Sequence, residues 1–325
     1  MISVWTLSGN KSVNITPLLK SIEWSGDKSQ ASRKLGLSVA YSIFDKNQVF
    51  IQITPGSLIW AMEDGNEFFR GVVFSRELSS SGQELKITAY DYLIYFLKSK
   101  ASFNFSNALP EDIAVKICQE VGVGAGSILK TGTRIDLIVQ AQSLYDVIMK
   151  AYTKVSQING RQYMALMKGT ALNIIEKGST VVDYTLKPEE NVIDTSYTES
   201  IENMVNKVKI YDDKGNYTGK LVSNDGWVKL YGVLQEAYTI EEGKNPTVVA
   251  ENMMHGLDIC TDIEVLGNRA CISGYALNTN IWYIDSLKNS KWYIDSDSHT
   301  WDIGTGKHTM KLTLYQQNEM DAKED

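Results

Sequence analysis

Residues 58–74 read LIWAMEDGNEFFRGVVF, two apolar runs on either side of Asp64-Gly65-Asn66. An Asp-Gly pair between apolar runs is a strong hairpin signal, because tight hairpin turns need residues that tolerate positive φ. We therefore predict that the two runs pair as antiparallel strands. This hairpin indicates that the first hundred residues are mostly strands.

The next stretch, GVVFSRELSSSGQELKITAYD at 71–91, repeats the arrangement and predicts a second hairpin. Side chains on a strand alternate between its two faces, so every second residue shares a face. On this basis we expect one strand to present Val72, Phe74 and Leu78 together, and its partner to present Leu85, Ile87 and Ala89.

Helical signals follow. A short helix is predicted within 91–100, where Asp91 is more simply an N-cap than a lone catalytic acid. A second helix begins at Pro110 and ends before Gly122, and a third is capped by Ser143. The segment 161–178 then predicts a hairpin that turns at Lys168-Gly169. Two helices and a hairpin predict a small α/β module between β regions.

Strands resume with a hairpin predicted at Asp213-Lys214-Gly215, and a helical insertion opened by Pro246 is predicted near 245–258. His255 is expected close to the end of that helix, where a cation meets the negative end of the helix dipole. It has no partner in a Glu-x-x-His or His-x-x-x-His pattern, so a metal site there is disfavoured.

Composition excludes several classes of function. The chain has 325 residues and a net charge of −7, and it has no cluster of Lys and Arg of the kind that binds phosphate backbones. It has no run of 18 or more apolar residues, the length that a membrane-spanning helix needs. Its cysteines, Cys118, Cys260 and Cys271, form no CxxC motif. They predict neither a disulfide framework nor a structural zinc site.

The stretch SDSHTWDIGTGKHTMKLTL at 296–314 holds His299, Asp302 and His308, the best candidates for a catalytic or metal site. A turn centred on Gly304 to Lys307 would place His299 opposite Leu312, about 13 Å along the ladder from His308. Two ligands of one zinc ion cannot be so far apart. No GxSxG or HExxH motif occurs either. We therefore predict a hairpin, with no catalytic, cofactor-binding or metal-binding residues and no enzyme activity.

The pentapeptide WYIDS occurs at 282–286 and again at 292–296. If both copies are strands, their four aromatic residues have two interpretations: a sugar-binding platform, or the packed interior of a β-barrel or subunit interface. The second is favoured, because a tryptophan in each strand must face the packed side. These aromatic residues are Trp282, Tyr283, Trp292 and Tyr293.

Four stretches spread along the chain, taken in order, resemble the baseplate hub proteins of contractile phage tails. The resemblance is to the type found in PBSX-like defective prophages, which is related to the late-control tail protein D family. The stretches are ITPLLKSIEWSGDKSQASRKLGLSVA (15–40), FFRGVVFSRELSSSGQELKITAYDYLIYFLKSK (68–100), SLYDVIMKAYTKVSQINGRQYMALMKGTALNII (143–175) and KWYIDSDSHTWDIGTGKHTMKLTL (291–314).

The resemblance implies an α+β, mainly β fold. It has two related antiparallel β-barrel domains, at 1–100 and 186–325, and the small α/β module at 101–185 between them. It also implies a structural function without cofactors: a homotrimeric ring that joins the tail tube to the central spike. The partners implied are further copies of the chain, the tail tube or tube-initiator protein, the spike and the baseplate wedge proteins.

The implied location is the baseplate of a virion or bacteriocin-like particle, assembled in the bacterial host cytoplasm. Neither a membrane nor a sequence-specific nucleic acid is an expected partner. Two other functions stay open: a tail-associated carbohydrate-binding protein that uses the WYIDS aromatic residues, and a tail-associated cell-wall-degrading enzyme.

Overall fold

The computed structural model describes residues 1–8, 10–29, 32–42, 53–79, 81, 83–240 and 245–323. Contacts divide the chain into two compact units, which are Met1–Thr195 together with Asp262–Asp325, and Ser196–Thr261. Strands outnumber helices and most strand pairs are antiparallel, which confirms the predicted mainly β, α+β fold class.

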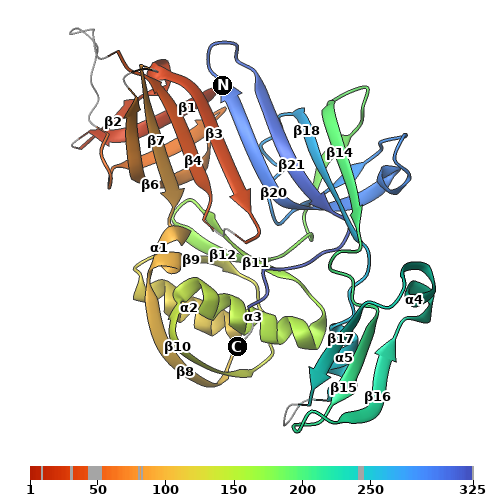
Figure 1. The fold of residues 1–325 in the computed structure, drawn as a ribbon. Helices are drawn as coiled ribbons and strands as arrows, with labels where there is room; N and C mark the ends of the chain where they lie inside the picture. The colour runs from red at the N-terminus through yellow and green to blue at the C-terminus, as the bar shows by residue number, and fades with distance from the viewer. Residues whose placement is uncertain are drawn as a thin grey trace. The chain divides into compact units, whose positions relative to one another are not determined.

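The largest sheet of the structure is built from both ends of the chain. The N-terminal strands are β1 (Ile2–Ser8), β2 (Lys11–Asn14), β3 (Leu19–Asp27), β4 (Lys34–Ala40), β5 (Leu58–Glu63), β6 (Asn66–Ser79) and β7 (Glu84–Asp91). The C-terminal strands are β13 (Val181–Leu186), β14 (Val192–Ser200), β18 (Asp258–Leu266), β19 (Ala276–Thr279), β20 (Ser290–Asp302) and β21 (His308–Tyr315). The order β14-β18-β21-β20-β3-β4-β7-β6-β5-β1-β2 places β3 directly beside β20 (Figure 1).

The two predicted N-terminal hairpins are confirmed as β5–β6 and β6–β7. Leu85, Ile87 and Ala89 share the buried face, as expected. The prediction for β6 is wrong, because Val72 lies opposite Tyr90 whereas Leu78 lies opposite Leu85, and these two residues are on different faces of β7. Apolar residues of this strand lie at both odd and even positions, and a register shift lies between Val73 and Ser75. Alternation alone therefore could not identify the inward face, since a slip of one residue reverses it.

The middle of the chain contains the predicted helices and hairpin, with additional strands around them. Its elements are α1 (Leu93–Lys98), β8 (Lys100–Ala108), α2 (Pro110–Glu120), β9 (Gly124–Ile128), β10 (Ile135–Ser143), α3 (Leu144–Asn159), β11 (Tyr163–Lys168) and β12 (Ala171–Glu176). Pro110 begins α2, and β11 pairs with β12 through the predicted turn. The antiparallel β8–β10 pair, and β9 beside β12, were not predicted. Apolar faces of α2 and α3 pack into one core with these strands.

Ser143 caps α3 as predicted: its Oγ accepts a hydrogen bond of 3.0 Å from the N–H of Asp146. Ser143→Ala is expected to lower the free energy of unfolding by about 1 kcal/mol, because one N–H at the helix start loses its acceptor. Chemical denaturation of the two proteins measures this loss. Ser143→Thr, which keeps the acceptor and the hydroxyl that donates to Asp146 at 2.6 Å, should recover most of it, and equal stability of the alanine and threonine variants would contradict the capping role.

The smaller unit is a three-stranded sheet with two short helices. Its elements are β15 (Lys207–Tyr211), β16 (Tyr217–Ser223), α4 (Asp225–Tyr231), β17 (Gln235–Thr239) and α5 (Pro246–Asn252). The hairpin at Asp213-Lys214-Gly215 is confirmed as β15–β16, and α4, capped by Asn224, was not predicted. The predicted helix is shorter than expected. It ends at Asn252, so His255 lies outside it, in a β-bridge with Val205.

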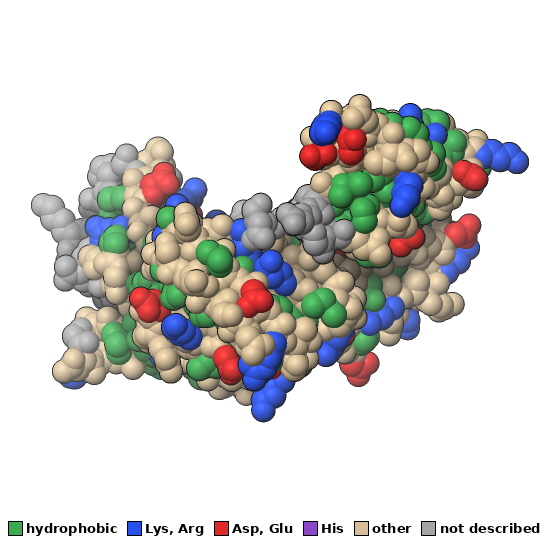
Figure 2. All heavy atoms as spheres, turned by 90° about the horizontal axis from the view of Figure 1, so that it is seen from below, with side chains coloured by type: hydrophobic (Ala, Val, Ile, Leu, Met, Phe, Trp, Pro, Cys, Tyr) green, Lys and Arg blue, Asp and Glu red, His purple; other side chains and the backbone are tan. Residues whose placement is uncertain are grey.

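The 1–100, 101–185 and 186–325 domain boundaries stay a prediction. Within the described ranges no helix combines the length and apolar character needed to cross a membrane. On the face shown in Figure 2, acidic and basic side chains are intermingled and hydrophobic ones are dispersed among them. No single sign of charge dominates that face.

Candidate functional site

The two histidines of the C-terminal hairpin touch each other, which corrects the predicted separation. Trp301 pairs with His308 and His299 pairs with Met310. The register therefore differs by two residues from the predicted one. The loop is longer than expected because Asp302 accepts hydrogen bonds from the N–H groups within the turn, at 2.9 Å from Thr305. A two-residue difference keeps each side chain on its face and makes the histidines diagonal neighbours.

His299 and His308 are joined by a contact of 3.2 Å between Nδ1 of His299 and Nε2 of His308. His299 is fully buried, and its Nε2 lies 3.0 Å from the carbonyl oxygen of Cys271. A carbonyl only accepts, so Nε2 of His299 carries a hydrogen and donates there. Within the part of the chain that the structure describes, no three His, Cys, Asp or Glu side chains are placed to hold a metal ion.

A buried ion pair joins the two ends of the chain beside these histidines. Arg33 precedes β4, and its guanidinium contacts both carboxylate oxygens of Asp297 on β20, one of them at 3.0 Å. The N–H of Ser273 also donates to Asp297 at 2.6 Å. Burial alone would raise the pKa of Asp297, but the charge of Arg33 and the hydrogen bonds from His299 and Arg33 outweigh it and lower the pKa to about 2. The carboxylate is therefore ionised at neutral pH.

Planar side chains stack next to this ion pair. The Arg33 guanidinium lies 3.9 Å from the ring centroid of Trp24, whose ring in turn meets Phe68 edge-on at 4.9 Å. Arg269 lies over Phe68 at 5.6 Å and is paired with Glu63 through its Nε at 3.1 Å. Cation–π contacts of this kind keep guanidinium groups fixed against aromatic faces.

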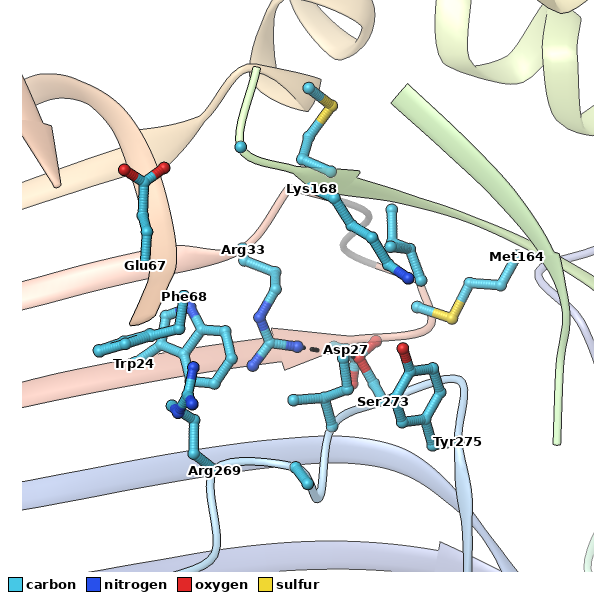
Figure 3. Close-up of a pocket in the computed structure, with 15 residues that line it drawn as sticks. Trp24, Asp27, Arg33, Glu67, Phe68, Met164, Lys168, Arg269, Ser273 and Tyr275 are labelled. Atoms are coloured by element: carbon cyan, nitrogen blue, oxygen red, sulfur yellow. Dashed lines mark hydrogen bonds between the residues drawn. The ribbon is translucent and has the colours of Figure 1, made fainter. Parts of the chain in front are cut away.

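A pocket of about 410 Å³ opens beside the stack. Figure 3 shows Trp24, Phe68 and Arg269 on one side of it and Met164 and Lys168, from the β11–β12 hairpin, on the other. Met164 can pack closely because Gly274 has no side chain: a Cβ there would lie 2.6 Å from its sulfur. The pocket is thus formed by the N-terminal strands, the central hairpin and the loop between β18 and β19.

A second ionic cluster lies where β12 ends against β20. The ammonium of Lys177 is fully buried and lies 2.5 Å from Asp295, which also pairs with Lys28 at 2.6 Å. Burial lowers the pKa of Lys177, and the attraction of Asp295 only partly opposes this. The cluster has a structural explanation, since Asp295 bridges two cations from distant segments and Glu319 lies 3.9 Å from one of them, Lys28.

The remaining candidates from the sequence are separate from the pocket. Asp91 lies one residue before the cap position and accepts from the N–H of Leu93 at 3.0 Å, so it does serve the helix start. It also accepts from Ser32 and from the N–H of Arg33. Burial raises its pKa to about 6 despite these hydrogen bonds. His255 pairs with Asp258 at 2.6 Å within the smaller unit.

The two copies of WYIDS adopt different structures, contrary to the prediction of two strands. The second copy lies in β20, with Trp292 fully buried. The first copy forms a turn and the 3₁₀ helix Asp285–Leu287, and leaves Trp282 63% exposed. The interpretation as packed interior therefore holds for Trp292 and is wrong for Trp282, for which a place in a subunit interface stays a prediction.

The features of the candidate site that sequence reasoning missed are the Arg33–Asp297 pair and the pocket next to it. Arg33 lies directly before the apolar strand β4, and Asp297 lies in the SDSH segment, where the histidines were the candidates. A weak signal for a buried ion pair existed, because a charged residue beside the end of an apolar strand usually has a partner of opposite charge when it is buried. Sequence alone gave no means of matching two residues so far apart.

The whole fold is similar to the folds of solved phage tail proteins. The 43 kDa tail protein of prophage MuSo2 from Shewanella oneidensis matches with a TM-score of 0.74 at 14% identity, over 100% of this chain and 99% of its own. The E. coli c3393 protein, a type VI secretion component similar in structure to T4 bacteriophage tail proteins gp27 and gp5, matches with a TM-score of 0.53 at 9% identity. That match covers 93% of this chain and 74% of c3393.

The chain belongs to the YqbQ-like family, whose model matches residues 22–315. Two Bacillus subtilis proteins are similar to it over 311 residues: YqbQ at 27% identity and the phage-like element PBSX protein XkdQ at 26%. The alignments cover 92% of both chains for YqbQ and 93% of both for XkdQ. The resemblance to PBSX-type tail proteins, drawn from four sequence stretches, is confirmed.

Proposed function

We propose that the chain is a structural subunit of the baseplate hub of a contractile phage tail or phage-tail-like particle. In this proposal three copies form a ring that joins the tail tube to the central spike. The observation that carries it is the likeness to a prophage tail protein over the entire chain. The relative from the PBSX element, and the similarity of c3393 to gp27 and gp5, support a place in the baseplate.

The architecture suits a part that must connect a sixfold tube to a threefold spike. Each chain contributes an N-terminal and a C-terminal set of strands, which meet at β3 and β20. Three chains would thus present six β regions around one axis. A cyclic trimer needs heterologous contacts, in which one face of a subunit meets a different face of its neighbour.

The proposed partners are the tail tube or tube-initiator protein, the spike, the baseplate wedge proteins and two further copies of the chain. The proposed location is the baseplate, after assembly in the host cytoplasm. We propose that the role is structural, without catalysis, and that the boundaries at residues 100 and 185 separate two β domains from the α/β module.

The structure argues against the sugar-binding alternative in its original form. A platform of four aromatic residues requires both tryptophans at the surface, and Trp292 has no exposed area. Only Trp282 and Tyr283 remain exposed, with their rings edge-on at 5.4 Å. A cell-wall-degrading function has no specific observation in its favour among the described residues.

Light scattering coupled to size-exclusion chromatography, from low to high micromolar concentration, tests the proposal. The expected mass rises with concentration from 36.4 kDa to three times that value. If the chain stays monomeric, the same measurement is repeated after co-expression with the tube and spike proteins. A chain that forms no trimer in either experiment contradicts the hub proposal.

A further inference from the structure

The N-terminal strands β1, β5 and β6 are apolar on both of their faces. Val4, Ile59 and Ala61 are buried in the core, and the residues that alternate with them lie on the outer face of the sheet. This outer face carries large apolar side chains that are only partly buried, and we call them the N-terminal patch: Trp5, Leu7, Leu58, Trp60 and Val72. A sheet whose outer face meets water alternates apolar and polar residues, whereas strands that are apolar on both faces are usually covered on both. The N-terminal patch therefore has the character of a surface that a partner covers.

Strand register makes the N-terminal patch continuous. Trp60 lies between Trp5 and Arg70 of the neighbouring strands, and Leu58 lies opposite Val72. The two indole rings are stacked with their centroids 6.5 Å apart, and the Arg70 guanidinium lies 5.1 Å from the centroid of the Trp60 ring. Tryptophan and arginine are enriched among the residues that carry most of the binding energy of protein interfaces, so this composition favours a protein as the partner.

The outer face is polar on other strands of the same sheet. On β20 and β21, Ser296 lies opposite Thr313 and Ser298 lies opposite Lys311, while Trp301 points into the core. The apolar outer face is therefore a local feature of β1, β5 and β6.

The first copy of WYIDS presents a second apolar surface, beside the strand β14. Trp282 and Tyr283 are exposed, but the loop that carries them is held in place: Ile281 and Leu287 are fully buried, and the N–H of Ile281 donates to the carbonyl oxygen of Leu287 at 3.0 Å. The Tyr283 hydroxyl donates to Oγ1 of Thr195 on β14 at 3.3 Å, on the face of that strand where an exposed isoleucine lies two residues earlier. We call the exposed side chains here the C-terminal patch: Ile193, Trp282 and Tyr283. Aromatic side chains on a rigid loop lose little conformational freedom when they bind.

The charges beside the two patches have opposite net signs. Next to the N-terminal patch, Lys11 on β2 has no ion-pair partner among the described residues. Next to the C-terminal patch, neither Glu189 nor Asp194 has one within the described part of the chain. Other charges nearby form ion pairs with one another, among them Arg70–Glu67, Lys187–Glu190 and Lys288–Asp285. Opposite signs of charge guide two surfaces toward each other and discriminate against wrong partners.

We propose that the N-terminal patch of one copy of the chain packs against the C-terminal patch of the next copy. The partner is a second copy because the chain itself carries both surfaces: each is apolar, each is at least partly open to solvent in a single chain, and the charges beside them are opposite in sign. Such a contact is heterologous, as a closed ring of three identical subunits requires. Closure at three copies rests on the proposed function, whereas the pairing of the two patches rests on the patches themselves.

Trp60→Arg and Trp282→Arg each place a charge in one patch, and light scattering coupled to size-exclusion chromatography measures the result. Under conditions in which the wild type associates, each variant alone should stay at 36.4 kDa, with self-association at least about 30-fold weaker, as for the loss of a binding hot spot. An equimolar mixture of the two variants should reach twice 36.4 kDa and no more, because one variant keeps an intact C-terminal patch and the other an intact N-terminal patch. Thr300→Arg, at an exposed position of β20, is the matched control and should associate as the wild type does.

Thermal unfolding establishes that each variant is folded, and Leu58→Lys or Tyr283→Lys replaces a tryptophan variant that unfolds at a lower temperature than the wild type. If either variant associates as the wild type does, or if the mixture stays at the mass of the monomer, the proposal is overturned, while a wild-type trimer still supports the hub. If the wild type associates through the two patches as a species other than a trimer, the proposal is supported and the hub is contradicted. A wild type that stays monomeric, alone and after co-expression with the tube and spike proteins, contradicts both.

Discussion

Arg33→Met is expected to lower the free energy of unfolding of the larger unit by about 3–5 kcal/mol, because it leaves the Asp297 carboxylate buried without its cation. Asp297 has only 2% of its surface exposed, and Arg33 is the one cation in contact with both of its oxygens among the described residues. The loss should be larger than that of the ion pair alone, since Arg33 also covers the face of Trp24.

Urea unfolding followed by tryptophan fluorescence measures the loss. Arg70→Met is the matched control: Arg70 pairs with Glu67 near the surface, with about a quarter of each side chain exposed, and should lose less than about 1 kcal/mol. The double variant Arg33→Met/Asp297→Leu should regain much of the stability, because it removes the stranded charge together with its partner. Equal losses for Arg33→Met and Arg70→Met would contradict the central role of the buried pair.

This ion pair illustrates what the sequence could and could not predict. Hairpins such as β5–β6 and β11–β12 were predicted because their turn residues lie between the strands they join. Helix α3 was predicted because its capping residue, Ser143, comes directly before it in the sequence. The pairing of β3 with β20 depends on segments more than 250 residues apart, and no local signal specifies it. The candidate site is built on that junction, so it could not be predicted either.

Local patterns also failed where tertiary contacts decide the outcome. Two identical copies of WYIDS became a strand and a 3₁₀ turn, because only the second copy finds strand partners on both sides, in β19 and β21. The hairpin of His299 and His308 was predicted, but its register was wrong by two residues. Both registers put the same residues inward, so the apolar pattern could not distinguish them.

His308 is expected to make the larger unit less stable as the pH falls from 6.5 to 4. Burial, and the nearby His299, lower the pKa of His308 from 6.5 to about 4. In this window the unfolded chain binds a proton that the folded chain does not, so the stabilisation is complete above pH 6.5 and is lost as the pH approaches 4. The loss from this group is no more than about 3 kcal/mol.

Asp91 acts in the opposite direction and must be separated from this effect. Its pKa of about 6 means that the folded chain takes up a proton before the unfolded chain does, which stabilises the fold as the pH falls below 6.

Unfolding free energies measured between pH 4 and pH 8 should therefore be compared between wild type and His308→Phe, in which Asp91 is unchanged. The phenylalanine keeps a ring against Trp301, which lies 4.1 Å from the His308 ring, without a titrating group. The difference between the two curves should stay constant above pH 7 and should shift in favour of the variant below pH 6.5. Parallel curves across the whole range would mean that His308 titrates alike in the folded and unfolded chains, and its burial against His299 would then have no electrostatic consequence.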